Sequence, residues 1–123
     1  MEIKGKVIRG DRYGREIGFP TINLSRNGFL KMKIKPAFGV YAGEVSIMSN
    51  TRCLTYKAGI VIGPLDKRKL PKIEAHMIGF KGNAYGKTAV FKINKFIRKF
   101  KKFKTEKELI EQIKKDLKKL VPY

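Results

Sequence analysis

One segment, Phe38-Gly-Val-Tyr-Ala-Gly-Glu-Val-Ser-Ile47, has the composition of a short β-strand. Its apolar side chains recur along the segment, at Phe38, Val40, Ala42, Val45 and Ile47. Ser49-Asn50, a pair typical of turns, follows it. We therefore predict a strand that ends in a turn.

Four more segments on either side have a β-compatible composition: Glu2–Arg9, Leu54–Ile62, Ile73–Phe80 and Thr88–Ile97. Turn-forming sequences separate the predicted strands, at Gly10-Asp11, Ser25-Arg26-Asn27-Gly28, Ser49-Asn50, Gly63-Pro64 and Lys81-Gly82-Asn83. Residues 26–37 and 63–72 form long basic connections, which we interpret as flaps or binding loops. Five or six short strands followed by one helix indicate an antiparallel barrel.

Helical periodicity is convincing only near the C-terminus. Apolar residues recur there at spacings of three and four, at Leu109, Ile110, Ile113, Leu117 and Leu120. Thr105 and Glu108 form a capping box, and lysines crowd the final turns, where the helix dipole favours cations. The pattern predicts an amphipathic helix over about 105–120 with one apolar face that docks on the rest of the domain. The helix follows a barrel that we expect over about 1–100.

The length of 123 residues is typical of one domain, so we expect a single domain over 1–123. Hydrophobic residues make up 42%, which favours a packed core over a disordered basic tail. No apolar run reaches the roughly 18 residues of a membrane span, and the N-terminus lacks the apolar stretch of a secretory signal. Cys53 is the single cysteine, which excludes an internal disulfide and a cysteine-based zinc site. We therefore expect a protein of the reducing cytoplasm.

The formal net charge of +19 is unevenly distributed. Residues 1–25 carry +2, residues 26–72 carry +8 and residues 73–123 carry +9. The excess is densest in Lys92–Lys104, which has seven basic residues and no acidic one. Three interpretations stay open: a solvated lysine-rich surface, binding to nucleic acid, and attraction of small anionic substrates.

Residues 10–23 carry the most distinctive pattern, Gly-Asp-Arg-Tyr-Gly-Arg-Glu-Ile-Gly-Phe-Pro-Thr-Ile-Asn. Its glycines let backbone N–H groups approach a phosphate, and Arg15 adds a charged donor. After Pro20 we expect an extended chain, so that Thr21 and Asn23 project to the same side. Their neutral oxygens suit Mg²⁺ when substrate phosphates and water complete its ligands. The alternative is a glycine-rich hairpin with a proline turn.

Glu74 is the second candidate, because it is the only acidic residue between Asp66 and Glu106 and lies in an otherwise apolar predicted strand. A carboxylate there is able to deprotonate a substrate hydroxyl. The alternative is an edge glutamate that faces one of the many lysines. His76 shares the strand face of Glu74, and we expect it to be a packed or capping residue.

Two further motifs have structural interpretations. Gly82–Thr88 resembles a phosphate-binding loop, but its glycines are too close together, so we predict a hairpin turn. Phe96–Phe103 interleaves aromatic and basic residues, and we expect its phenylalanines to anchor the connection to the helix in the core. The alternatives for this segment are stacking on a planar ligand, on single-stranded nucleic acid or on an anionic membrane.

In this order, the pieces resemble the riboflavin kinase family, in particular the kinase module of bacterial bifunctional FAD synthetases. The specific part is Gly18-Phe-Pro-Thr-Ile-Asn23. Weaker pieces follow over nearly the whole chain: Gly39-Val40-Tyr41, Ile62-Gly63, Glu74-Ala75-His76, Tyr85-Gly86-Lys87, Arg98, Phe103, and a helix with Glu108-Leu109-Ile110 and Asp116.

The resemblance implies a mainly β protein, a six-stranded antiparallel Greek-key barrel with a C-terminal amphipathic helix. It implies Mg²⁺-dependent transfer of the ATP γ-phosphate to the 5′-hydroxyl of riboflavin, which gives FMN. By position, Glu74 would be the catalytic base, Thr21 and Asn23 would hold the metal, Gly10, Arg15 and Gly18 would bind nucleotide, and Arg98, Lys101 and Phe103 would bind flavin. The length leaves no room for an adenylyltransferase domain, so we do not expect FAD synthesis.

Four positions depart from the family pattern: Val61, Pro64-Leu65-Asp66, Gly79 and Phe100. We expect these departures to affect flavin affinity and nucleotide preference more than the reaction. The expected partners are riboflavin, ATP and Mg²⁺, and we expect a monomer. A basic barrel that binds nucleic acid and a flavin-binding relative without catalysis are the alternatives.

Overall fold

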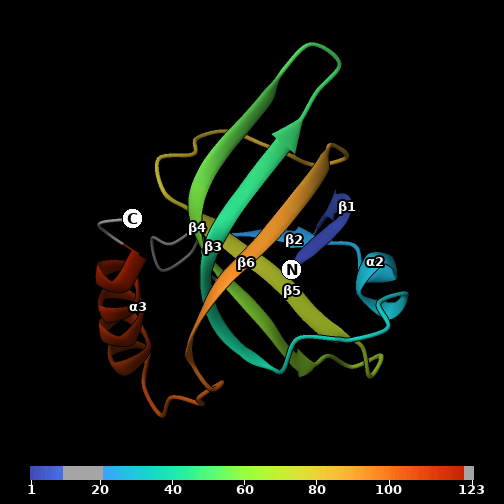
Figure 1. The fold of residues 1–123 in the computed structure, drawn as a ribbon. Coiled ribbons are helices and arrows are strands. Elements are labelled where there is room, and N and C mark those ends of the chain that lie inside the picture. Colours follow the sequence, from blue (N-terminus) through green and yellow to red (C-terminus); the bar gives the residue numbers. More distant parts are fainter. Residues whose placement is uncertain (10–20, 121–123) are drawn as a thin grey trace.

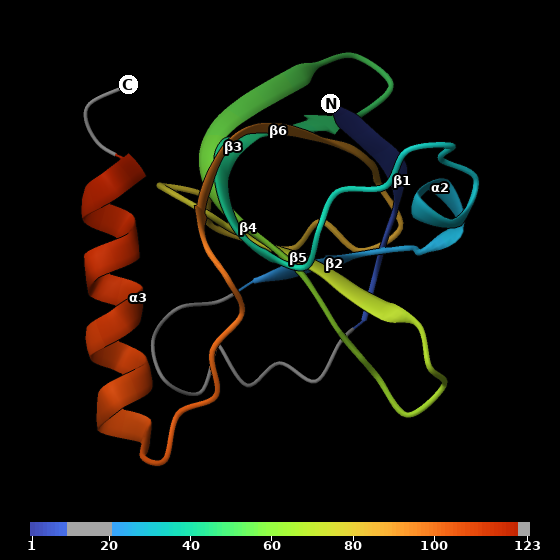
Figure 2. The ribbon, with the colours of Figure 1, turned by 60° about the horizontal axis from the view of Figure 1, so that its bottom comes forward.

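Residues 1–9 and 21–120 are described by the structure, a computed structural model. Six antiparallel strands close into a barrel in the order β1-β2-β5-β4-β3-β6 (Figures 1 and 2). The strands are β1 (Glu2–Ile8), β2 (Ile22–Leu24), β3 (Gly39–Met48), β4 (Cys53–Leu65), β5 (Pro71–Met77) and β6 (Thr88–Arg98). Helices α2 (Asn27–Leu30) and α3 (Glu106–Leu120) lie outside the barrel (Figure 2). The predicted six-stranded barrel with a C-terminal helix is confirmed.

The barrel interior is filled because the strands alternate between inward apolar and outward side chains. In β5, Ile73, Ala75 and Met77 are buried, and the residues between them are only partly covered. The largest fully buried side chains come from all six strands: Ile3, Leu24, Val45, Ile60, Ile62, Ile73 and Phe91. This alternation leaves one face of β5 free to carry polar groups on the outside of the barrel.

Three local predictions need correction. Gly63-Pro64 is not a turn, because β4 continues through it to Leu65 with a shift in its register with β5. The predicted turn at 25–28 leads into α2, a single helical turn that buries Phe29. Gly82–Thr88 is not a hairpin, because β5 and β6 are not neighbours in the barrel. Turn-forming residues show where a chain bends, but not which strand it joins next.

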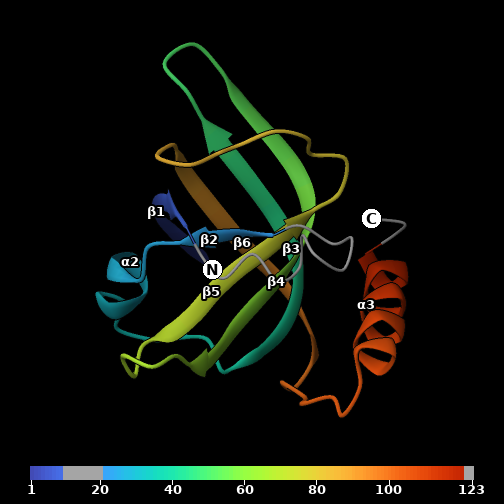
Figure 3. The same ribbon diagram turned by 180° about the vertical axis from the view of Figure 1, so that it is seen from behind.

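Helix α3 begins with the predicted cap. Thr105 Oγ1 accepts a hydrogen bond of 3.2 Å from the N–H of Glu108, and the Glu108 carboxylate accepts one of 3.3 Å from the N–H of Lys104. The helix stands beside the barrel, and residues 99–105 connect it to β6 (Figure 3). Neither helix in the described ranges is long and apolar enough to cross a membrane.

Candidate active site

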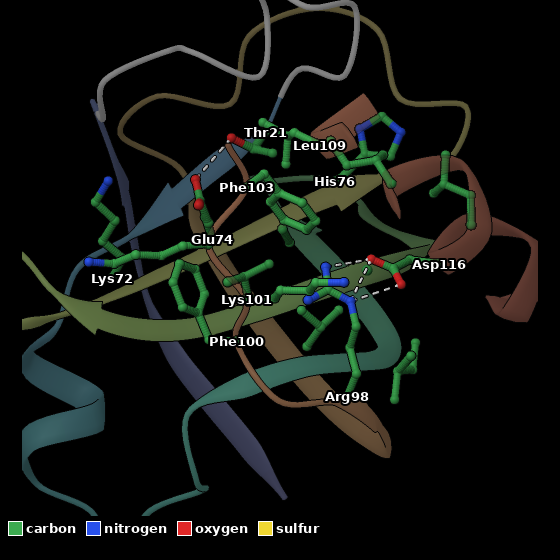
Figure 4. Close-up of a pocket in the computed structure, with 18 of the residues that line it drawn as sticks. Thr21, Lys72, Glu74, His76, Arg98, Phe100, Lys101, Phe103, Leu109 and Asp116 are labelled. Atoms are coloured by element: carbon green, nitrogen blue, oxygen red, sulfur yellow. Dashed lines mark hydrogen bonds and ion pairs between the residues drawn. The ribbon is translucent and has the colours of Figure 1, made fainter. Parts of the chain in front are cut away.

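A cavity of about 640 Å³ is lined by the outer face of the barrel on one side and by α3 with residues 99–105 on the other (Figure 4). The barrel wall contributes Thr21 and outward residues of β4 and β5, including Val61, Glu74 and His76. This volume falls in the range of small-molecule sites, about 300–1,000 Å³. The cavity therefore has a strand-built wall and a separate cover, which we define as residues 99–120.

Thr21 and Glu74 meet on the wall. Thr21 Oγ1 donates a hydrogen bond of 3.3 Å to Glu74 Oε2. Asn23 lies directly opposite Glu74 in the β2–β5 ladder, and opposed residues of an antiparallel pair share one face. Since Ile22 and Leu24 on either side are buried, Asn23 points outward. Two candidate metal ligands and a candidate base therefore share the outer face of the barrel, although Asn23 is not itself among the cavity residues.

The oxygens of Thr21 and Asn23 fit Mg²⁺. Because the Thr21 hydroxyl donates its hydrogen bond to Glu74, the lone pairs of its oxygen remain available to a cation. In the described part of the chain, no three His, Cys, Asp or Glu side chains form a cluster that could hold a metal ion by itself. Mg²⁺ does not need such a cluster, since it usually keeps waters and binds substrate phosphates with one or two protein groups.

The three residues predicted to bind flavin, Arg98, Lys101 and Phe103, all line the same cavity. The Arg98 Cζ atom lies 5.8 Å from the centroid of the Phe103 ring, and the Lys101 Nζ atom lies 5.7 Å from it. Arg98 is in turn held by Asp116 of α3, with 2.9 Å between Nη2 and Oδ2. In Figure 4 the Phe103 ring lies between the Thr21–Glu74 pair and the Arg98–Asp116 pair.

The structure thus gathers much of the predicted site. Around the cavity are Thr21, Glu74, Arg98, Lys101 and Phe103, and Asn23 pairs with Glu74 beside it. The predicted nucleotide-binding residues Gly10, Arg15 and Gly18 lie outside the described residues. The roles of all nine residues remain predictions.

Sequence reasoning missed what α3 contributes to the cavity. Leu109, Ile113 and Leu117 were expected to dock on the barrel, but they line the cavity and are only half-buried. Their spacing identified the correct face of the helix, which is the signal that a sequence provides. The spacing did not indicate that a cavity lies between this face of the helix and the barrel. His76 also lines the cavity and is half-buried, and its role as a packed or capping residue stays a prediction.

The prediction that the phenylalanines of Phe96–Phe103 anchor in the core is wrong. Phe96 is 47% exposed and packs edge-on against Tyr41, and Phe100 is 40% exposed and lines the cavity. Phe96 lies within β6 with its ring on the exposed side of the strand, whereas β6 ends at Arg98 and the chain has left the barrel before Phe100. Apolar residues beyond that point therefore cover the outer face.

The departures from the family pattern fall at different places. Val61 and Phe100 line the cavity and make it more apolar. Gly79 does not line it, and its φ of +83° in the turn after β5 requires glycine. Asp66 lies in the β4–β5 turn, where it accepts hydrogen bonds from the N–H groups of Arg68 and Leu70. Val61 and Phe100 are therefore the departures that line the cavity, and their effect on flavin affinity stays a prediction.

Fold and site together define a closed β-barrel with a small-molecule site on its outer face. Residues 1–122 match the model of the family described as riboflavin kinase. The chain belongs to the riboflavin kinase family.

Individual proteins and solved structures are similar to this chain. The bifunctional riboflavin kinase/FMN adenylyltransferase of Bacillus subtilis is 37% identical over 122 residues, which are 98% of this chain and 38% of that protein. The crystal structure of a macrolide-efflux protein from Streptococcus pneumoniae has a TM-score of 0.85 at 28% identity, covering 99% of this chain and 38% of that one. A riboflavin kinase from Trypanosoma brucei shares the fold, with a TM-score of 0.71 at 19% identity over 97% of this chain and 73% of that one. The chain spans under two fifths of the length of its B. subtilis relative.

Proposed function

We propose that this chain is a riboflavin kinase that transfers the γ-phosphate of ATP to the 5′-hydroxyl of riboflavin, producing FMN with Mg²⁺ as the metal. The B. subtilis relative carries two activities in its name, and the proposal takes only the kinase. The observation that carries it is the hydrogen bond between Thr21 and Glu74. It joins a candidate metal ligand to a candidate base at the wall of a cavity that fits a small ligand.

Glu74 is the group that accepts the proton of the substrate hydroxyl. Phosphoryl transfer depends mainly on positioning and charge stabilisation, with one base that orients the nucleophile. As the hydroxyl oxygen bonds to the γ-phosphorus, the bond to the β–γ bridging oxygen breaks and ADP leaves. The Glu74 backbone is paired on both sides, with Asn23 of β2 and Val61 of β4, so its position is fixed before substrate arrives.

Thr21 and Asn23 would hold Mg²⁺, which neutralises phosphate charge when bound. The Thr21 hydroxyl also orients the Glu74 carboxylate through its hydrogen bond. The same contact therefore supports both binding and proton transfer.

The cover supplies recognition. Phe100 and Phe103 offer apolar ring surfaces to a planar flavin, and aromatic rings stack favourably on such ligands. Lys101, Lys102 and Lys104 also line the cavity, and their positive field attracts ATP and holds the anionic product. Part of the charge excess of residues 73–123 thus has a place in the proposed reaction.

The test is direct. We expect the protein to form FMN and ADP from riboflavin, ATP and Mg²⁺, with chromatographic separation of the flavins as the measurement, and to stop when the metal is chelated. Lumiflavin, which has the ring system but no ribityl chain, is the control that binds without accepting phosphate. Absence of FMN with each of the four common nucleoside triphosphates would overturn the proposal.

The alternatives have distinct signatures in the same preparation. A yellow protein that retains flavin but gives no FMN would be a flavin-binding relative without catalysis. Steeply salt-dependent binding to oligonucleotides, with no flavin binding, would favour the nucleic-acid alternative.

A further inference from the structure

Asp116 is the one charged side chain that is buried in the described part of the chain, with 9% exposure. It lies on the cavity face of α3 and accepts from Arg98 Nε at 3.1 Å and from Arg98 Nη2 at 2.9 Å. Gln112, one turn earlier on the helix, donates to the same carboxylate at 3.0 Å. A buried carboxylate with this many donors holds them in one geometry, because releasing any of them leaves charge poorly solvated.

Arg98 is the last residue of β6, so the ion pair joins the barrel to the helix at the point where the cover begins. Its third guanidinium nitrogen, Nη1, donates to the carbonyl of Lys99 at 3.2 Å. Each guanidinium nitrogen thus donates at least one hydrogen bond within the protein. The guanidinium also lies beside the Phe103 ring, at 5.8 Å.

These contacts connect Asp116 to Arg98, and Arg98 in turn to the backbone at Lys99 and to the ring of Phe103. The apolar residues of α3 that face the cavity are only half-buried, so hydrophobic burial fixes the helix weakly. The ion pair is therefore well placed to determine where the cover sits relative to the wall.

We propose that Asp116 is a positioning residue: through Arg98 it holds residues 99–105 and Phe103 in the conformation that receives the flavin. The inference rests on the proposed function, and it assigns Arg98 an organising role in addition to lining the cavity. Glu74 and Thr21 lie on the strand-built wall, on the other side of the Phe103 ring from this pair (Figure 4). Asp116 therefore governs affinity for riboflavin and leaves the phosphoryl-transfer step nearly unchanged.

Asp116→Asn removes the charge and keeps the shape of the side chain. We expect the Kd and KM for riboflavin to rise roughly tenfold, within the usual range of coupling between contacting residues, while kcat stays within about threefold. Quenching of riboflavin fluorescence measures the Kd. A merely structural role would lower the active fraction and kcat and leave KM unchanged.

Another ion pair, Arg26–Asp66, provides a matched control. It has the same 2.9 Å separation, and its side chains are 18% and 20% exposed, against 19% and 12% for Arg98 and Asp116. Neither Arg26 nor Asp66 lines the cavity. Asp66→Asn should therefore leave the riboflavin Kd unchanged.

A double variant tests whether Asp116 acts through Arg98. Arg98→Gln combined with Asp116→Asn should bind riboflavin no more weakly than Arg98→Gln alone, because the same chain of contacts is already broken. Additive losses of affinity would contradict the proposed route. If Asp116→Asn does not fold, Gln112→Ala removes one donor to the carboxylate and should weaken binding in the same direction by less.

Hydrogen exchange separates this inference from the proposed function, because it needs no substrate. Amides of residues 99–105 should exchange faster in Asp116→Asn than in the unaltered protein, and those of β5 should not change. If the protein makes no FMN, the proposed function is wrong. Amide hydrogen exchange of residues 99–105 would still show whether Asp116 positions this segment. Unchanged exchange in a folded Asp116→Asn, or an unchanged riboflavin Kd in a chain that makes FMN, would overturn the inference.

Discussion

The wall and the cover of the cavity are built in opposite ways. On the wall, Glu74 stands on a strand that is hydrogen-bonded to neighbours on both sides and backed by the buried core. On the cover, Phe103 and the apolar face of α3 are half-buried, and an ion pair ties them to the end of β6. Groups that must meet a reacting atom within tenths of an ångström benefit from the rigid element, whereas ligand entry requires a part that can move.

The largest effect expected from this division is on chemistry at the wall. Glu74→Gln keeps the size of the side chain and one oxygen that can accept from Thr21, but removes its basicity. We expect kcat for FMN formation to fall by at least roughly 10²-fold, the lower range for loss of a general base, with the riboflavin Kd little changed. Turnover near that of the unaltered protein would remove Glu74 from the mechanism. A large loss of riboflavin affinity would place recognition on the wall and break the comparison.

Thr21→Val addresses the same wall with a smaller effect. The substitution keeps the branched shape and removes the hydroxyl that donates to Glu74. We expect the Mg²⁺ concentration needed for half-maximal activity to rise by at least roughly tenfold, the scale seen when groups supporting a metal site are removed. Thr21→Ser, which retains the hydroxyl, is the control and should stay close to the unaltered protein. Equal magnesium requirements in the two variants would argue against a ligand role.

The same division explains which features the sequence could predict. Strands with local composition and turn signals, such as Phe38–Ile47, were predicted to within a residue or two of β3. The extent of β4 was not, because Gly63-Pro64 has the composition of a turn but lies within a strand whose position is set by its neighbour β5. Strand order was predicted only through family resemblance, since pairing across the barrel depends on contacts between distant residues.

In the candidate site too, local sequence patterns were predicted and contacts between distant residues were not. Glu74 stood out because an acid in an apolar strand is conspicuous, and the outward direction of Thr21 and Asn23 follows from strand alternation. The link between Arg98 and Asp116 was not predicted, although both residues belong to the resemblance, because they are 18 positions apart in the sequence with loop and helix between them. A spacing pattern identifies a helix face, but the tertiary fold decides which side chain on that face meets which partner.

A matched pair of substitutions measures how differently the two parts are held. Ile60 on β4 is fully buried, whereas Ile113 on α3 is half-buried against the cavity. Ile60→Val should lower the free energy of unfolding by about 0.5–1.5 kcal/mol, the usual cost of removing one buried methylene. Ile113→Val should cost less than about 0.5 kcal/mol, as at partly exposed sites. Urea unfolding of both variants is the measurement, and equal costs would mean that α3 packs as tightly as the core.

The Arg26–Asp66 ion pair at a barrel turn extends the comparison to pH, with the smallest expected effect. In the β4–β5 turn, the N–H of Leu70 is the main cause that holds the pKa of Asp66 below its usual range, and the N–H of Arg68 and the charge of Arg26 act in the same direction. The native state therefore binds this proton less readily than the unfolded chain, whose Asp pKa is about 3.9. The stabilisation is present above that value and is lost as pH falls through the lower native pKa.

Asp66→Asn should therefore be less stable than the unaltered protein at pH 6, and the difference should shrink as pH falls below about 4. Urea unfolding at constant ionic strength between pH 3 and pH 7 measures it. Arg26→Gln is the discriminating control, since it removes the ion pair and leaves the backbone donors of Leu70 and Arg68 in place. Most of the acid dependence should survive in Arg26→Gln. Its complete loss would mean that the charge of Arg26, and not the turn backbone, holds Asp66 ionised.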